Sequence, residues 1–242
     1  MIFKENFKIG SNIVEISTES ALSKKVKEEI EFLIAFFLKE LNHNIADSSA
    51  WKFNNGQIKL PIYVKPEFIH YFKYVFKLFN NHPDTFTPYS VSFFNMDMVS
   101  LDDNDEYIVK NQDFKFDTSF FRVIFVLEYI AAYLKEKKIN AFLIESEEKY
   151  IACGNNGWII NPYGHEYKLI DSAAICFHYV PSGFESHKFG AIGNDLKESD
   201  ALAVGKSLAE LRVLTPQIVY LNTKTDLTRF AFENEIEVVF LN

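Results

Sequence analysis

Apolar residues recur at intervals of three or four positions in three stretches of the chain, which is the spacing of one buried face of an α-helix. The pattern predicts helices at residues 22–41, 66–80 and 120–134. Thr18 or Ser20 offers a cap for the first helix, and Pro66 suits the first position of the second. A fourth helix is expected to begin between Asp195 and Ser199 and to end before Pro216.

Short runs of alternating apolar and polar residues predict strands around these helices. Residues 7–16 predict one strand, and residues 51–53 and 57–60 predict a hairpin across Asn54-Asn55-Gly56. After the third helix, an antiparallel meander is expected at residues 139–144, 149–152, 158–160, 168–170 and 173–180, and two closing strands at 218–221 and 236–241. Neither a linker nor a repeat divides the chain, so the pattern predicts a single α+β domain over residues 1–242, an antiparallel sheet with flanking helices.

Composition narrows the class of protein. The 242 residues carry 25 Lys and Arg against 33 Asp and Glu, a net charge of −8, and 48% are hydrophobic, which is typical of a globular chain. This acidic balance, without a basic stripe, argues against nucleic acids and anionic membranes as partners. The charged amino terminus and the lack of a long apolar run predict a soluble, cytoplasmic protein without a membrane span. Cys153 and Cys176 lack a metal-ligand spacing and are expected to be reduced core residues.

Two aspartates are candidates for chemistry. Asp200 shares a predicted helix face with the apolar Leu196 and Ala203, and a carboxylate in such a place needs a cation, a metal or several donors. The alternative is that Asp200 sits in the first turn and favours the helix dipole. Asp117 ends the segment before the third helix, where it either caps backbone amides or marks a helix end that a ligand approaches. The six histidines are dispersed, and no pair has the four-residue spacing of two metal ligands on one helix.

Six segments in chain order resemble motifs of one family. Residues 47–50 match the family's Asp-Ser-Glu-Leu, residues 85–88 its Phe-Asp-Pro-Thr, and residues 117–124 its Asp-Leu-Gly-Gly-Ile-Ala-Lys-Gly. Further along, residues 174–179 match Ala-Thr-Ser-Gly-Asp-Tyr, residues 186–190 match His-Ile-Ile-Asp-Pro-Arg-Thr-Gly, and residues 199–204 match Ala-Asp-Ala-Leu-Ala-Thr. On these segments the sequence resembles the ApbE-like flavin transferases, the FAD:protein FMN transferases first described as thiamine-biosynthesis lipoproteins. The resemblance spans nearly the whole chain and implies that family's α+β fold.

The same resemblance implies a set of site residues. Asp200 and Asp117 match positions that hold magnesium in the family, and Asp117, Thr87 and Tyr179 match its FAD-binding segments. His187 matches a histidine expected to assist proton transfer. FAD and magnesium are thus the implied cofactors, and a flavin nucleotide and a protein partner are the implied ligands.

Several positions depart from the family pattern. Ser119-Phe120 and Ser146-Glu147 stand where the family has glycine pairs, and these side chains crowd a flavin pyrophosphate. Val204 replaces a threonine ligand and Val123 replaces a lysine. We therefore expect a degenerate ApbE-like protein that has lost or reduced FMN transferase activity and retains flavin or partner binding.

Two alternatives remain from the sequence. The first is an active magnesium-dependent enzyme that transfers FMN to a protein threonine, in which Asp200→Ala abolishes turnover. The second is a structural or interaction protein, in which part of the 25 phenylalanines forms a self-association surface.

Overall fold

The computed structural model describes residues 1–81, 89–90, 95–118, 122–146, 149–161, 166–177, 215–221 and 237–240. The chain forms two compact units: the sheet unit, Met1–Glu31 with Val126–Asn242, and the aromatic unit, Phe32–Phe125. The division falls inside helices α1 (Lys24–Glu40) and α4 (Arg122–Glu136), so each helix contributes residues to both units. The single domain predicted over residues 1–242 stays a prediction.

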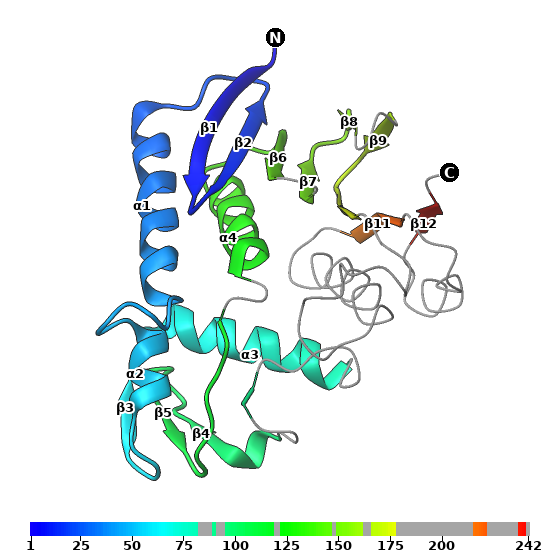
Figure 1. Ribbon diagram of the computed structural model, residues 1–242. Helices are drawn as coiled ribbons and strands as arrows, with labels where there is room; N and C mark the ends of the chain where they lie inside the picture. The colour runs from blue at the N-terminus through cyan, green and yellow to red at the C-terminus, as the bar shows by residue number, and fades with distance from the viewer. Residues whose placement is uncertain are drawn as a thin grey trace. The chain divides into compact units, whose positions relative to one another are not determined.

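A seven-stranded sheet organises the sheet unit, in the order β1-β2-β6-β7-β10-β11-β12 (Figure 1). Its neighbours from β1 to β10 are antiparallel, whereas β10, β11 and β12 are parallel. The strands are β1 (Phe3–Ile9), β2 (Asn12–Thr18), β6 (Phe142–Ser146), β7 (Lys149–Cys153), β10 (Ser172–Phe177), β11 (Thr215–Leu221) and β12 (Glu237–Phe240). This sheet with flanking helices confirms the predicted α+β class.

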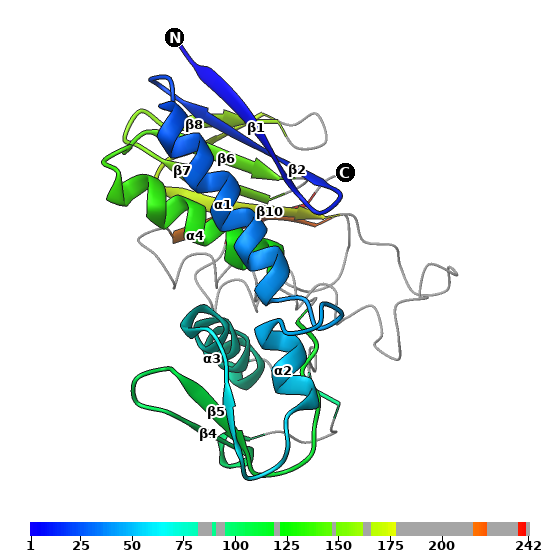
Figure 2. The same ribbon diagram turned by 90° about the vertical axis from the view of Figure 1, so that its left-hand side faces the viewer.

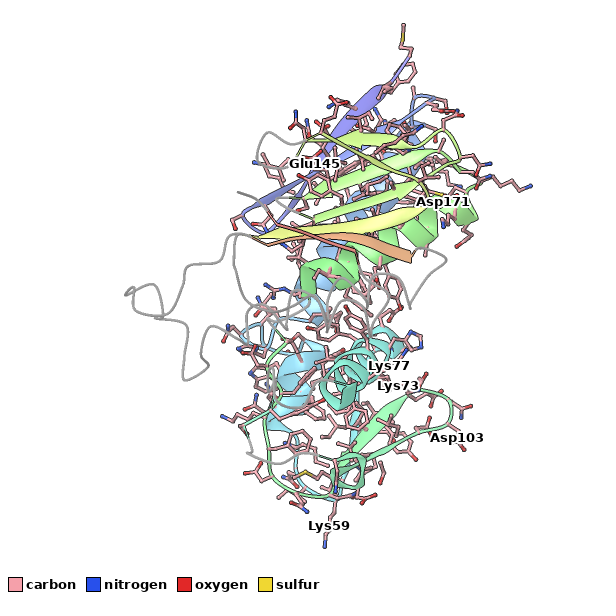
Figure 3. The ribbon with its side chains drawn as sticks, turned by 90° about the vertical axis from the view of Figure 1, so that its right-hand side faces the viewer. Lys59, Lys73, Lys77, Asp103, Glu145 and Asp171 are labelled. Atoms are coloured by element: carbon pink, nitrogen blue, oxygen red, sulfur yellow. The ribbon has the colours of Figure 1, made fainter. Side chains whose placement is uncertain are left out.

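Both helices of the sheet unit cover the same face of this sheet. In Figure 2 α1 and α4 lie in front of the strands, and in Figure 3, from the opposite side, the strands stand in front of the helices. A row of directly paired residues, Ile16, Ile144 and Ile151, is buried on one face of three adjacent strands. Successive side chains alternate between faces, so residues two apart in each strand build this core.

The aromatic unit holds two helices and a small sheet. Its elements are α2 (Ser49–Asn55), β3 (Pro61–Tyr63), α3 (Pro66–Asn81), the 3-10 helix η1 (Met96–Met98), β4 (Val99–Leu101) and β5 (Tyr107–Lys110). The three strands pair antiparallel in the order β3-β5-β4, with α2 and α3 next to them (Figures 1 and 2). Phe53 is fully buried at the centre, and its ring centroid lies 5.5–6.3 Å from those of Phe68, Phe72, Phe114 and Phe116. Much of the phenylalanine excess thus forms this core.

The three helices predicted from spacing are confirmed as α1, α3 and α4, and the expected fourth helix lies outside the described residues. The strands of the predicted meander are also present. However, among the described strands β8 (Trp158–Ile160) and β9 (Tyr167–Leu169) pair only with each other, and β10 pairs with β7 instead of β9. The meander is therefore interrupted by a separate hairpin.

The prediction of one strand at residues 7–16 is wrong. β1 and β2 form a hairpin there, in which Ile9 pairs with Asn12 across Gly10 and Ser11. Gly10 has φ +63°, a left-handed conformation that glycine adopts without steric cost, and this allows the reversal. The expected caps at Thr18 and Ser20 are also wrong, because the Ser23 hydroxyl accepts the Val26 N–H at the start of α1.

The hairpin predicted across Asn54-Asn55-Gly56 is wrong as well. These residues end helix α2, whose cap is Ser48: its side chain accepts the Trp51 N–H at 3.0 Å. The Ser48 side chain is itself positioned by a second hydrogen bond, because its hydroxyl donates to the Asn42 carbonyl at 2.7 Å. A capped helix start thus takes residues that the Asn-Gly turn signal assigns to strands.

Candidate functional site

Asp117 is the predicted site residue that the structure describes. It lies in the aromatic unit between Phe116 and the start of α4, and its side chain is partly exposed. Thr87, Tyr179, His187 and Asp200 lie outside the described residues. The site is therefore built from the surroundings of Asp117.

A hollow of about 440 Å³ opens beside Asp117. Its lining mixes two aromatic side chains with short polar and charged ones: His43, Asn54, Tyr89, Ser90, Lys115, Phe116 and Asp117. These residues come from the segment after α1, from the end of α2 and from two segments that meet at an antiparallel bridge between Tyr89 and Phe116. Four separate stretches of chain thus converge at one carboxylate.

The backbone on the amino-terminal side of Asp117 is held by side chains. Asn54 Nδ2 donates to the Phe116 carbonyl at 3.0 Å, and the Phe116 N–H donates to Asn54 Oδ1 at 2.8 Å. Ser90 makes a similar pair of bonds with Lys115: its N–H donates to the Lys115 carbonyl at 2.9 Å, and its Oγ accepts the Lys115 N–H at 2.8 Å. The segment leading to Asp117 is therefore fixed from two sides.

Thr118 fixes the carboxyl-terminal side of Asp117. Its side chain is buried, its carbonyl accepts the Tyr71 hydroxyl at 3.0 Å, and its Oγ1 lies 3.4 Å from His43 Nδ1. Tyr71 belongs to α3, so this contact connects that helix with the site segment. With both neighbours anchored, the position of the Asp117 backbone is determined by the fold.

The lining of the hollow combines charged groups with a neutral aromatic hydroxyl. The exposed ammonium of Lys115 and the carboxylate of Asp117 give it one cation and one anion two residues apart. Burial raises the pKa of the Tyr89 hydroxyl, so Tyr89 remains neutral across the physiological range. The arrangement suits a ligand that has an aromatic ring, hydroxyls and an anionic group.

The described part of the hollow does not fit a complete magnesium site. Magnesium requires about six oxygen ligands in near-octahedral geometry, and among the described residues Asp117 is the only carboxylate that lines the hollow. Among the described residues, no group of three or more His, Cys, Asp or Glu side chains is placed to hold a metal ion. The side chains that line the hollow therefore do not by themselves support a metal-dependent step.

Sequence reasoning missed His43, Asn54 and Tyr89 as parts of this site. His43 is 74 positions from Asp117 and Asn54 is 63, and neither belongs to a recognisable motif. Asn-Asn-Gly is a strong local turn signal, which favours a turn rather than a site role for Asn54. Only the tertiary contacts with residues 116–118 bring these side chains to the site.

A second hollow, of about 500 Å³, lies in the sheet unit near the start of β8. Its polar lining includes Glu19, Lys138, Asn140, Asn155 and Asn156. Asp117, the predicted site residue that the structure describes, does not line it. We therefore place the candidate site at Asp117.

No helix within the described residues has the length and apolar character required to cross a membrane. No family model matches the sequence, and no curated protein matches it.

Solved structures of flavin transferases share the fold. The apo form of the Pseudomonas stutzeri flavinyl transferase ApbE matches with a TM-score of 0.63 at 12% identity, covering 86% of both chains. The ApbE protein from Thermotoga maritima matches at 0.60 and 13% identity, over 97% of this chain and 92% of that one. The flavin transferase ApbE from Vibrio cholerae matches at 0.54 and 15% identity, over 70% and 67%. The chain thus has an ApbE-like fold, as the sequence motifs predicted.

Proposed function

We propose that this protein binds a flavin nucleotide in the hollow beside Asp117 and that its FMN transferase activity is lost or greatly reduced. The observation that carries the proposal is the anchored Asp117 segment beside a ligand-sized hollow, in a fold shared with flavin transferases. At about 440 Å³ the hollow falls within the range of roughly 300–1,000 Å³ typical of small-molecule pockets.

Each part of a flavin nucleotide has a chemical counterpart in the lining. Tyr89 and Phe116, which are 5% and 1% exposed, give the hollow an apolar wall for the flavin ring, and the Lys115 ammonium suits the phosphate. The Asp117 carboxylate accepts hydrogen bonds from ribityl hydroxyls or from a ring N–H, and Ser90 supplies a short hydroxyl. Binding of this kind requires only the chain's own side chains.

Reduced transfer is supported by the residue that replaces a family glycine. Ser146, which stands at the first position of a glycine pair, is 1% exposed at the end of β6. Its Oγ has no hydrogen-bond partner among the described residues. Ser146 therefore places a buried side chain where the family's glycine has none. Val123, in place of a lysine, removes a positive charge that would stabilise phosphoryl transfer.

Titration of the full chain with FMN and FAD, with and without millimolar magnesium, tests the binding proposal. We expect quenching of flavin fluorescence with a micromolar dissociation constant. Lys115→Ala should weaken binding by a factor of about 10–100, because a hydrogen bond to a charged group contributes about 1.5–3 kcal/mol. Asp117→Ala should also weaken it, whereas Asp103→Ala, an exposed aspartate on the β4–β5 turn (Figure 3), should not. Failure of the wild-type chain to bind either flavin refutes the proposal.

A transfer assay tests the second half of the proposal. The full chain is incubated with FAD, magnesium and an acceptor protein of an active flavin transferase, and covalent flavin is followed by in-gel fluorescence. We expect no turnover above that of Asp200→Ala. Turnover that Asp200→Ala abolishes would establish the active enzyme instead.

A further inference from the structure

Strand β3 forms one edge of the small sheet in the aromatic unit. The strand order is β3-β5-β4, so among the described strands β3 has a neighbour, β5, on one side only. Tyr63, at the end of β3, is 67% exposed, and Leu60, just before the strand, is 51% exposed. The second edge of β3 thus borders a surface that solvent reaches.

The register shows which backbone groups this free edge offers. Antiparallel pairs alternate between hydrogen-bonded and non-hydrogen-bonded, and the Val64 N–H donates to the Glu106 carbonyl. Ile62, paired with Ile108, is therefore the next hydrogen-bonded position. It follows that the N–H and C=O of Tyr63 and the C=O of Pro61 point away from β5. Within the described part of the chain no hydrogen bond to these groups is seen, so they can pair with one more strand.

A hollow of about 410 Å³ runs along this edge. It is lined by four consecutive residues of chain, Leu60, Pro61, Ile62 and Tyr63, and by Trp51 and Lys52 in the middle of α2 together with the residues that end this helix. Because alternate side chains of a strand point to opposite faces, a hollow that touches four successive residues follows the edge of the strand. The hollow is a groove between an edge strand and a helix.

The groove brings together exposed apolar side chains and positive charge. Trp51 and Leu60, which line the groove, are 36% and 51% exposed; Tyr63 is 67% exposed, and its ring lies against that of Tyr107 on β5, with the centroids 5.8 Å apart. Lys52 is the only charged residue among the described residues that line it, and the neighbouring Lys59 projects into solvent (Figure 3). Neither lysine pairs with a carboxylate among the described residues, although the chain as a whole carries a net charge of −8.

We propose that the groove between α2 and β3 binds an extended peptide segment of a partner protein, which adds as a short strand to β3. The partner segment forms main-chain hydrogen bonds with Tyr63 and Pro61, places apolar side chains on Trp51 and Leu60, and carries acidic residues that face Lys52 and Lys59. Pro61 has no N–H to donate, so the edge of β3 can form only a few main-chain hydrogen bonds with an added strand. The side chains of the groove then supply the specificity. This surface goes beyond flavin binding and does not depend on it.

Selection of linear peptides displayed on phage tests the proposal on the full chain. Three libraries are compared: acidic residues alternating with apolar ones, basic residues alternating with apolar ones, and a proline-rich set. We expect enrichment from the acidic library only. A synthetic peptide of the enriched sequence should lose about tenfold or more in affinity for Tyr63→Ala and for Leu60→Ser, because exposed anchors carry most of such binding energy.

Matched variants distinguish peptide binding in the groove from nonspecific hydrophobic binding. Ile58→Ser removes a 43% exposed apolar side chain that does not line the groove, and it should leave peptide affinity unchanged. Lys52→Glu should lower the affinity for the acidic peptide and leave the thermal unfolding midpoint within a few degrees of wild type. Equal enrichment of all libraries, preference for the proline-rich set, or affinity unaffected by Tyr63→Ala overturns the proposal. Concentration-dependent self-association abolished by Tyr63→Ala also overturns it, since the occupant is then a second copy.

Discussion

Asn54 and Phe116 lie 62 positions apart in the chain and exchange two hydrogen bonds, at 3.0 and 2.8 Å. The primary amide of Asn54 presents a donor and an acceptor side by side, which is how a neighbouring backbone would pair with Phe116. One side chain at the end of α2 therefore acts as a substitute strand for the segment that carries Asp117. The stability of the aromatic unit and the geometry of the site depend on the same contact.

Asn54→Ala should lower the free energy of unfolding by about 2 kcal/mol, because it leaves two partly buried backbone groups of Phe116 without partners. Urea denaturation measures this loss, and the flavin titration should show weaker binding by the variant. The matched control is Asn55→Ala, since Asn55 Nδ2 donates to the Trp51 carbonyl on the exposed side of α2. A loss as large for Asn55→Ala as for Asn54→Ala would contradict the special role of Asn54.

Lys110 is a buried cation beside the aromatic core. Its side chain is 1% exposed, its Nζ donates to the Phe114 carbonyl at 3.4 Å, and Nζ lies 5.5 Å from the centroid of the Phe53 ring. Asp113, 3.9 Å away, is 83% exposed and gives it little compensation. Desolvation lowers the pKa of Lys110, an effect that Asp113 opposes and Lys115 adds to.

The pH dependence follows from the sign of this shift. Because the folded chain holds the Lys110 proton less tightly than the unfolded chain, the unfolded state binds more protons between the lowered pKa and 10.5. Stability should rise with pH across that window. Lys110→Met should therefore be more stable than wild type by about 1 kcal/mol at pH 7, with the difference shrinking toward pH 10.5. Urea denaturation across this range checks it, with the exposed Lys115→Met as control; a less stable Lys110→Met at pH 7 would refute it.

The sequence predicted elements whose signal is local and repeated. α1, α3 and α4 each bury one face, and burial of a face appears directly as apolar residues every three or four positions. The incorrect secondary-structure predictions concern segments in which a single residue determines the local structure. Gly10, at φ +63°, turns an alternating run into a hairpin, and Ser48 caps a helix in a stretch that is rich in turn residues.

The candidate site was predictable to the extent that a motif marked it. Asp117 stands at the start of a family-like segment, so its position was found from sequence. His43, Asn54 and Tyr89 take part only through contacts with residues 116–118, made by stretches far away in the chain. No local window contains such partners, because their role depends on how the aromatic core folds.

Two glycines with positive φ allow the cost of backbone strain to be compared with the cost of a steric clash. Gly10 has open space where a Cβ would be, so Gly10→Ala adds only backbone strain, about 1 kcal/mol. Gly157, at φ +72°, would place a Cβ 2.8 Å from Ile170 Cγ1 and 3.0 Å from the Leu169 carbonyl oxygen. Gly157→Ala should therefore cost more than Gly10→Ala, by about 1–3 kcal/mol. Denaturant unfolding of both variants compares them, and Gly10→Asn should recover part of the loss; equal costs for the two alanine variants would contradict the steric part.

Glu29 connects the two helices that cover the large sheet. Its carboxylate accepts the Tyr133 hydroxyl of α4 and pairs with Lys137 Nζ at 3.2 Å. The Tyr133 hydrogen bond, followed by Lys137, lowers the pKa of Glu29, although partial desolvation opposes this. The folded state therefore favours the ionised carboxylate.

Because the pKa of Glu29 is lowered on folding, its contribution to stability is present above about pH 4.5 and is lost as the pH falls through the folded pKa. Wild type should lose thermal stability on acidification more steeply than Glu29→Gln, whose side chain does not titrate. Differential scanning calorimetry between pH 3 and pH 7 measures the two midpoints. Glu28→Gln is the control, since Glu28 is 60% exposed and its pair with Lys24, at 3.7 Å, lies within one helix face. Parallel acid profiles for wild type and Glu29→Gln would show that this contact between α1 and α4 does not set the acid stability of the sheet unit.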